Sequence, residues 1–113
     1  MTKFDISNNA ILAAGGKELA AALKNNQVMT ELNLAGNQLG RKEAYGAADM
    51  SGVMDIANTI PTMGAMTKLT ISGDYTHSTP VTIETSMIEA DFSKKALGAS
   101  GAIMVAAFLP KCQ

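Results

Sequence analysis

The stretch Met29-Thr30-Glu31-Leu32-Asn33-Leu34-Ala35-Gly36-Asn37-Gln38-Leu39 sets the pattern from which the rest of the chain can be interpreted. It follows the order L-x-x-L-x-L-x-x-N-x-L, with Met29 in the first position. Leu32 and Leu34 alternate along an extended backbone, so both side chains point to one face of a strand. Asn37 comes where the chain must turn, and its amide can both donate to and accept from backbone groups. The stretch therefore predicts a half-buried strand followed by a tight turn.

The same pattern recurs three more times along the chain, with decreasing similarity. The matching positions are filled by Met1, Phe4, Ile6, Asn9 and Ile11 in the first copy, by Met66, Leu69, Ile71, Asp74 and Thr76 in the third, and by Met87, Ala90, Phe92, Lys95 and Leu97 in the fourth. These copies divide the chain into repeats of approximately 1–28, 29–65, 66–86 and 87–113, which together form a single domain.

Stacked repeats would place the turn residues Asn9, Asn37 and Asp74 one above the other as a polar ladder. An ionised Asp74 accepts hydrogen bonds but donates none, so it can replace the amide only in part. Lys95 in the fourth copy cannot replace it in kind. We therefore expect the ladder to end toward the C-terminal side.

Segments with helical periodicity follow the strands of the first, second and fourth repeats. The first runs from Ala13 to Lys24, the second is capped by Asp49 or Ser51 and stopped by Pro61, and the third begins at Ser100 and is stopped by Pro110. The expected inward side chains are Leu19, Leu23, Val53, Ile56, Ile60, Ile103, Val105, Ala106 and Leu109. Aligned small residues at Gly15, Gly52 and Gly101 indicate close backbone packing where each helix begins.

Two repeats differ in length from the first. The second is longer by a polar insertion at 41–49, and the third, between Met66 and Met87, is too short for a full helix. The residues 75–80 are typical of a loop, and Val81-Thr82-Ile83-Glu84-Thr85 favours an extended backbone. The third repeat is therefore expected to lack its helix.

Phe4-Asp5-Ile6-Ser7-Asn8-Asn9-Ala10-Ile11 and Leu32-Asn33-Leu34-Ala35-Gly36-Asn37-Gln38-Leu39, each followed by a Gly and a helical segment, resemble the leucine-rich-repeat family. The closest subtype is the one typified by ribonuclease inhibitor. This resemblance implies an α/β solenoid with four parallel strands on the concave face and about three helices on the convex face. It also implies binding of other proteins through the concave face.

The outward residues of the four expected strands are the candidate protein-binding residues. They form one row of Lys3, Glu31, Lys68 and Glu89, a second of Asp5, Asn33, Thr70 and Asp91, and a third of Ser7, Ala35, Ser72 and Ser93. The first row alternates in charge, which is also the pattern of simple cross-strand pairing. The rows contain neither an aromatic residue nor arginine, the usual anchors of tight protein interfaces.

The insertions are the rival location for a binding site, because loops carry function more often than regular elements do. Arg41 and Tyr45 lie in the first insertion, and Tyr75 and His77 lie in the second. A tyrosine in a repeat insertion is more often packed over the core, so we expect both tyrosines to pack there.

A catalytic or metal-binding role would depend on His77, the only histidine of the chain. Asp74 is near it in sequence, and the possible nucleophiles are Ser72, Ser78 and Cys112. None of these residues stands in a nucleophile signature, and Asp74, His77 and Glu84 lack a specific metal-ligand spacing. We therefore predict no catalytic residue, no metal and no cofactor; a small hydrolase or metal-binding protein using His77 is the remote alternative.

Composition excludes several classes of protein. The chain has 113 residues, a net charge of −1 and 47% hydrophobic residues, which disfavours both disorder and electrostatic binding of nucleic acid. Its apolar runs are too short to span a membrane, and the acidic Asp5 comes too early for a signal peptide, so we expect none. The single cysteine, Cys112, suits a reducing compartment, so we expect a cytoplasmic protein.

Neither end of the repeat pattern carries a polar cap of the kind that solenoids need. This predicts either a fragment of a longer array or a homo-oligomer formed through the uncapped ends. The expected function is a non-catalytic protein–protein interaction module whose partner is another protein, neither nucleic acid nor a membrane. A purely structural spacer between other repeats is the alternative.

Overall fold

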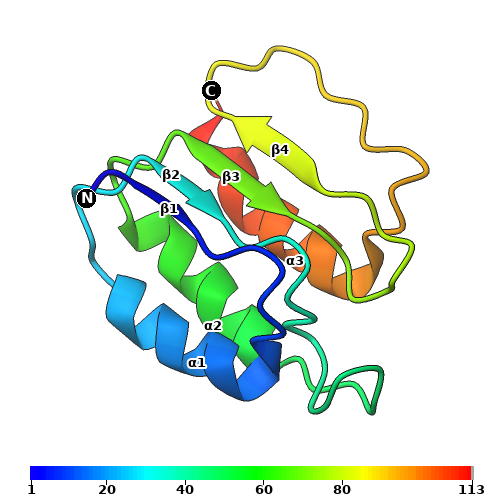
Figure 1. Ribbon diagram of the computed structural model, residues 1–113. Helices are drawn as coiled ribbons and strands as arrows, with labels where there is room; N and C mark the ends of the chain where they lie inside the picture. The colour runs from blue at the N-terminus through cyan, green and yellow to red at the C-terminus, as the bar shows by residue number, and fades with distance from the viewer. Residues whose placement is uncertain (113) are drawn as a thin grey trace.

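In the computed structural model of the protein, one mixed sheet is covered on a single face by helices (Figure 1). The structure describes residues 1–112. The strands are β1 (Lys3–Asp5), β2 (Glu31–Asn33), β3 (Lys68–Ile71) and β4 (Val81–Glu84), in that spatial order. The helices are α1 (Leu12–Leu23), α2 (Ser51–Thr59) and α3 (Gly98–Phe108), with short 3-10 turns η1 (Ile60–Thr62) and η2 (Leu109–Lys111) following α2 and α3.

The register of the first three strands is the one that the repeat alignment predicts. β1 and β2 pair in parallel with Lys3 opposite Glu31, and β2 and β3 pair in parallel with Glu31 opposite Lys68. Each connection contains a helix, which lies beneath the sheet as a crossover connection must. The mixed α/β class and the position of three strands are therefore confirmed.

The expected fourth parallel strand is wrong. β4 is Val81–Glu84, and it pairs with β3 in antiparallel fashion, with Lys68 opposite Glu84. The reason is the length of the connection: the loop 72–80 is too short for the crossover of a dozen or more residues that a parallel pair needs. The chain returns directly instead, so the helix predicted to be missing from the third repeat is indeed missing. Glu89 and Asp91 consequently lie in the loop that follows β4.

Small residues bring α1 and α2 together, as the sequence predicts, although at Gly16 rather than Gly15. A Cβ on Gly16 would lie 3.4 Å from the Cα of Gly52, and one on Gly52 would collide with the carbonyl oxygen of Ala13. Gly16 and Gly52 therefore set the distance between these helices.

α2 begins where Asp49 accepts hydrogen bonds from the backbone N–H and hydroxyl of Ser51.

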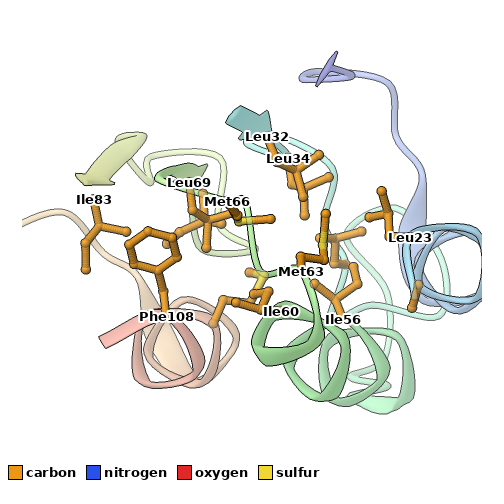
Figure 2. Packing of buried hydrophobic residues seen from close by; sticks show 14 of the residues in the cluster. Leu23, Leu32, Leu34, Ile56, Ile60, Met63, Met66, Leu69, Ile83 and Phe108 are labelled. Atoms are coloured by element: carbon orange, nitrogen blue, oxygen red, sulfur yellow. The ribbon is translucent and has the colours of Figure 1, made fainter. Parts of the chain in front are cut away.

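The core lies between the sheet and the helices (Figure 2). Its largest fully buried side chains include Leu32, Leu34, Ile56, Ile60, Met63, Met66, Leu69, Ile71, Ile83, Met104 and Phe108. The expected inward face of α3 is wrong at Ala106 and Leu109, which are exposed, whereas Met104 and Phe108 are buried. Nearly every residue of α3 is apolar, so its periodicity contains no information about which face turns inward.

The predicted polar ladder exists between the first two repeats. Buried Asn37 accepts a hydrogen bond from the backbone N–H of Asn9 at 2.8 Å and donates to the carbonyl oxygens of Ile6 and Leu34 at 3.0 Å. Asp74 departs from this pattern as an acceptor-only group should, because it accepts from the N–H of Gly40 and the hydroxyl of Ser100. The ladder therefore joins two turns and then gives way to a contact with α3.

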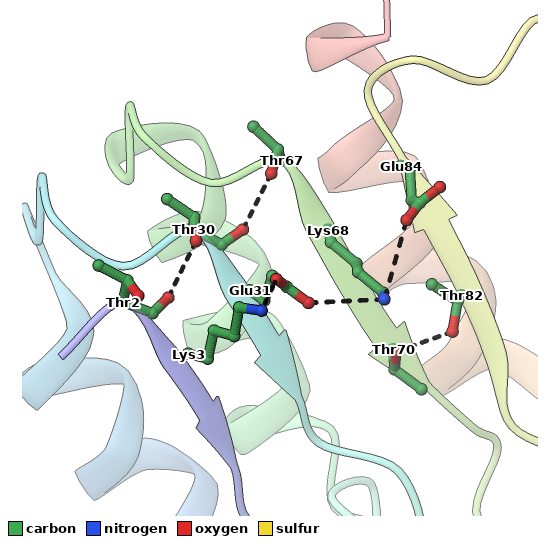
Figure 3. A network of polar contacts seen from close by, with 9 residues as sticks. All are labelled: Thr2, Lys3, Thr30, Glu31, Thr67, Lys68, Thr70, Thr82 and Glu84. Atoms are coloured by element: carbon green, nitrogen blue, oxygen red, sulfur yellow. Dashed lines mark hydrogen bonds and ion pairs between the residues drawn. The ribbon is translucent and has the colours of Figure 1, made fainter.

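A second ladder, which the sequence pattern did not indicate, lies at the start of the strands. The hydroxyl of Thr30 donates to the carbonyl oxygen of Thr2, and the hydroxyl of Thr67 donates to that of Thr30, at 3.1 and 3.3 Å (Figure 3). Backbone N–H groups of Thr30 and Thr67 bind the same two oxygens. Both ends of the parallel strands are therefore pinned in one register.

We expect Asn37→Ala to lower the free energy of unfolding by about 2–4 kcal/mol, because it removes four hydrogen bonds and leaves buried backbone groups unpaired. Asn9→Ala, at the exposed end of the ladder, is the matched control and should cost less than about 1 kcal/mol. Urea unfolding followed by circular dichroism measures both. Equal losses in the free energy of unfolding for the two variants would contradict the larger role assigned to Asn37.

Candidate functional site

The face of the sheet opposite the helices, here called the open sheet face, is the surface on which the predicted binding residues meet. It forms a shallow depression of about 430 Å³. The depression is lined by Lys3, Phe4, Asp5, Glu31, Leu32, Asn33, Lys68, Thr70 and Thr82. Six of the eight candidate residues are thus brought together, and the two in the loop after β4, Glu89 and Asp91, are not.

A continuous row of ion pairs crosses the open sheet face (Figure 3). Lys3 Nζ lies 3.2 Å from Glu31, and Lys68 Nζ lies 3.5 Å from Glu31 and 3.8 Å from Glu84. Glu84 occupies the place expected for Glu89, so the predicted alternation of charge is preserved with a different residue. Isolated surface pairs contribute about 0–1 kcal/mol each, and a network orients its members more strongly.

The second row bonds mainly to its own near neighbours. Asp5 accepts from the N–H and the hydroxyl of Ser7 at 3.0 and 2.7 Å, and the hydroxyls of Thr70 and Thr82 are 2.8 Å apart. The hydroxyl and N–H of Ser7 hold the pKa of Asp5 below its ordinary value. Asn33 likewise accepts from a nearby backbone N–H. This row therefore offers a partner polar groups that are already oriented.

Asp91 makes the same kind of turn as Asp5, but away from the sheet. It accepts from the N–H of Ser93 at 2.9 Å, and the hydroxyl and N–H of Ser93 lower its pKa. The D-x-S pattern at these two positions therefore indicates the same local turn. It does not indicate a strand, which is why the strand predicted around Asp91 from the fourth repeat is absent.

A second candidate surface lies at the loop ends of the strands. We call it the tyrosine rim and define it by Arg41, Tyr45, Asp74, Tyr75 and His77. The side chain of His77 stacks on Tyr75 with ring centroids 5.5 Å apart, and the Arg41 guanidinium lies 5.6 Å from the centroid of the Tyr75 ring. Tyr45 is 69% exposed and Tyr75 50%, so the expectation that these rings pack over the core is wrong for both.

The tyrosine rim borders a polar hollow of about 270 Å³. Both tyrosines line it together with side chains from the turns after β1, β2 and β3, among them Asn8, Gln38 and Ser72. Arg41 is held in place by its hydrogen bond to the carbonyl oxygen of Gly46 at 2.8 Å. The rim therefore supplies the aromatic and arginine side chains that the open sheet face lacks.

The geometry around His77 is that of a surface ring stack. The carboxylate of Asp74 is engaged by Gly40 and Ser100, and the hydroxyl of Ser78 donates to the carbonyl oxygen of Lys95. Across residues 1–112, no three His, Cys, Asp or Glu side chains gather in a way that could hold a metal ion. The sulfur of half-buried Cys112 lies 3.5 Å from the carbonyl oxygen of Glu84, far along the sheet from the rim.

Glu84 and Thr82 are the residues of these surfaces that sequence reasoning missed. The alternation Val81-Thr82-Ile83-Glu84 was the available signal, since it places Thr82 and Glu84 on one face of a strand. Only the antiparallel direction of β4 brings Glu84 opposite Lys68.

The ion pairs with Lys3 and Lys68 hold the pKa of Glu31 below its ordinary value of 4.5, and the hydrogen bond from Lys3 is the largest cause. Because the pKa is lowered in the folded state, the stabilisation is present above pH 4.5 and is lost as the pH falls through the lowered value. We expect Lys3→Gln to raise the pKa of Glu31 in an NMR titration of its side-chain carboxyl carbon. Lys17→Gln, on α1, should leave it unchanged, and equal titration curves for all three proteins would rule out the pairing.

No protein-family model matches the chain, and neither a curated protein nor a solved structure matches it significantly. Within residues 1–112, no helix is long and apolar enough to cross a lipid bilayer. The resemblance to leucine-rich repeats therefore stays a prediction from the sequence.

Proposed function

We propose that this protein is a non-catalytic protein-binding module of leucine-rich-repeat type, similar to the ribonuclease-inhibitor subtype. The observation that carries the proposal is the shared register of the first three strands, which places the repeat residues Lys3, Glu31 and Lys68 in one row on an uncovered face. The helices cover the other face of the sheet, so a partner could reach the strands only through the open sheet face and the loops at their ends.

Two features support the solenoid part of the proposal for the first three repeats. The Asn37 amide connects equivalent positions of the first two repeats, and the hydroxyls of Thr30 and Thr67 each donate to the carbonyl oxygen of the equivalent threonine in the preceding repeat. Each of the first two repeats also places its helix beneath the sheet. In this proposal β4 ends the stack, because an antiparallel strand does not continue a parallel repeat.

The proposed partner is a folded protein or peptide that spans the open sheet face and the tyrosine rim. The sheet face supplies orientation through its alternating charges, because a complementary row can replace or extend the existing pairs. The rim supplies contact area through Tyr45 and Tyr75, which are exposed aromatic side chains of the type that dominates binding energy. We therefore assign affinity to the rim and orientation to the sheet face.

A structural spacer is the second candidate, and one observation favours it. Every charge of the row on the open sheet face already has an ion-pair partner within the chain. A surface whose charges are mutually satisfied gains little from a further ion pair. A spacer would need neither the exposed tyrosines nor the hollow beside them. Substituting the tyrosines should therefore affect a binding module and leave a spacer unaffected.

Affinity capture from cells that naturally express the chain, with quantitative mass spectrometry, tests the proposal. We expect Tyr45→Ser combined with Tyr75→Ser to lower recovery of the partner at least about tenfold, since aromatic anchors contribute about 2 kcal/mol or more. Glu31→Lys should lower it by a smaller factor through lost orientation.

The matched controls lie on the helical side, where Met54→Ser and Glu18→Lys make the same kinds of change at exposed positions. They should leave recovery unchanged. A protein retained equally by all of the variants, or no protein enriched by the unmodified chain over the controls, would favour the spacer.

A further inference from the structure

We propose that β1 pairs with β1 of a second copy of this chain, in antiparallel orientation about a two-fold axis through Phe4. The pairing would join two four-stranded sheets into one, with the helices of both copies on the same side. It does not require the partner proposed above, because backbone groups at the edge of the sheet make the pairing; only the side chains of Lys3 and Asp5 also belong to the open sheet face.

The outer edge of β1 has backbone groups available for pairing. Ile6 and Asn8 donate their N–H groups to Asn33 and Ala35, and Thr2 accepts from Thr30, so the even-numbered residues bond to the strand beside them. The alternation of a parallel ladder then directs the N–H and C=O groups of Lys3 and Asp5 away from β2. The edge ends at Ser7, whose N–H is occupied by the carboxylate of Asp5.

The opposite edge of the sheet is less available. The N–H of Glu84 donates to the sulfur of Met87 at 3.3 Å, and the thiol of Cys112 donates to the carbonyl oxygen of Glu84 at 3.5 Å. These contacts occupy both backbone groups at the end of β4. The β1 edge has no such cover within the described residues, so it is the better template for an added strand.

The apolar layer beneath β1 is also incomplete. Phe4, Ile6, Ile11 and Leu19 are only partly buried, although the residues that correspond to the first three in the second repeat, Leu32, Leu34 and Leu39, are each 2% exposed. With Phe4 on the axis, the two rings would lie opposite each other at a non-hydrogen-bonded position, where cross-strand side chains are closest. Pairing would therefore extend the core as well as the sheet.

The charges of Lys3 and Asp5 favour this register over the two adjacent ones. With Phe4 on the axis, Lys3 of each copy lies opposite Asp5 of the other, and these are the residues whose backbone groups point outward. With Lys3 or Asp5 on the axis, two like charges would face each other, which disfavours the pair. The row of alternating charges that begins at Glu84 and passes through Lys68, Glu31 and Lys3 would then continue onto Asp5 of the second copy.

Sedimentation velocity across roughly 10 μM to 1 mM, the range expected for a small interface, tests the proposal. We expect the unmodified chain to dimerise with rising concentration. Lys3→Asp and Asp5→Lys should each weaken self-association roughly tenfold or more, because each places like charges opposite each other on both sides of the axis. Glu84→Lys, a charge reversal at the far edge, is the matched control and should dimerise like the unmodified chain.

The decisive arm mixes the two single variants. The Lys3→Asp variant carries a negative charge on both sides of Phe4, and the Asp5→Lys variant carries a positive charge on both sides. Opposite charges would therefore face each other throughout the mixed pair, so the mixture should form a heterodimer although neither variant pairs with itself. The combined Lys3→Asp/Asp5→Lys variant should likewise recover homodimerisation.

Circular dichroism establishes that each variant is folded before its association is measured. An unmodified chain that stays monomeric over the whole concentration range would overturn the proposal. A mixture of the two folded single variants that shows no heterodimer would overturn it equally.

Discussion

The amide of Asn37 is the interaction on which the parallel part of the structure depends. It is buried beside the turn that follows β2, and it binds both its own repeat and the preceding one. An amide can do this because it carries donors and an acceptor in one short side chain. The threonine hydroxyls at the other end of the strands have a similar effect, so the register is held at both ends while the leucines fill the space between.

The change of strand direction at β4 shows how chain length limits a repeat. Parallel pairing requires a crossover, and the first two connections are long enough to contain α1 and α2. The loop 72–80 is not, so β4 returns antiparallel and α3 is reached only through the long loop that follows. Asp74, at the position of the ladder asparagine, now contacts Ser100 at the start of α3. The third repeat therefore keeps the strand residues of the motif, while its turn residue, Asp74, has different partners.

Protein interfaces usually combine charged groups with aromatic anchors, and in this protein the two kinds of group lie on separate surfaces. The open sheet face has ordered charges without aromatic anchors, and the tyrosine rim has anchors beside a polar hollow. Pairing through the β1 edge would leave both surfaces accessible in each copy, since it uses only the flank of the first repeat. It would also double the number of binding surfaces, and two linked sites bind a divalent target more tightly than one.

Local pattern determined the positions of β1, β2 and β3, the register between them, the Asn9–Asn37 contact and three members of the charge row. These features depend on residue spacing within a strand and turn, and alternation of side chains along a strand is a local property. The direction of β4, the inward face of α3 and the places of Glu84 and Ser100 were decided by tertiary structure. They depend on how far a connection can reach and on which side of a uniformly apolar helix meets the core, and neither is encoded in a short window of sequence.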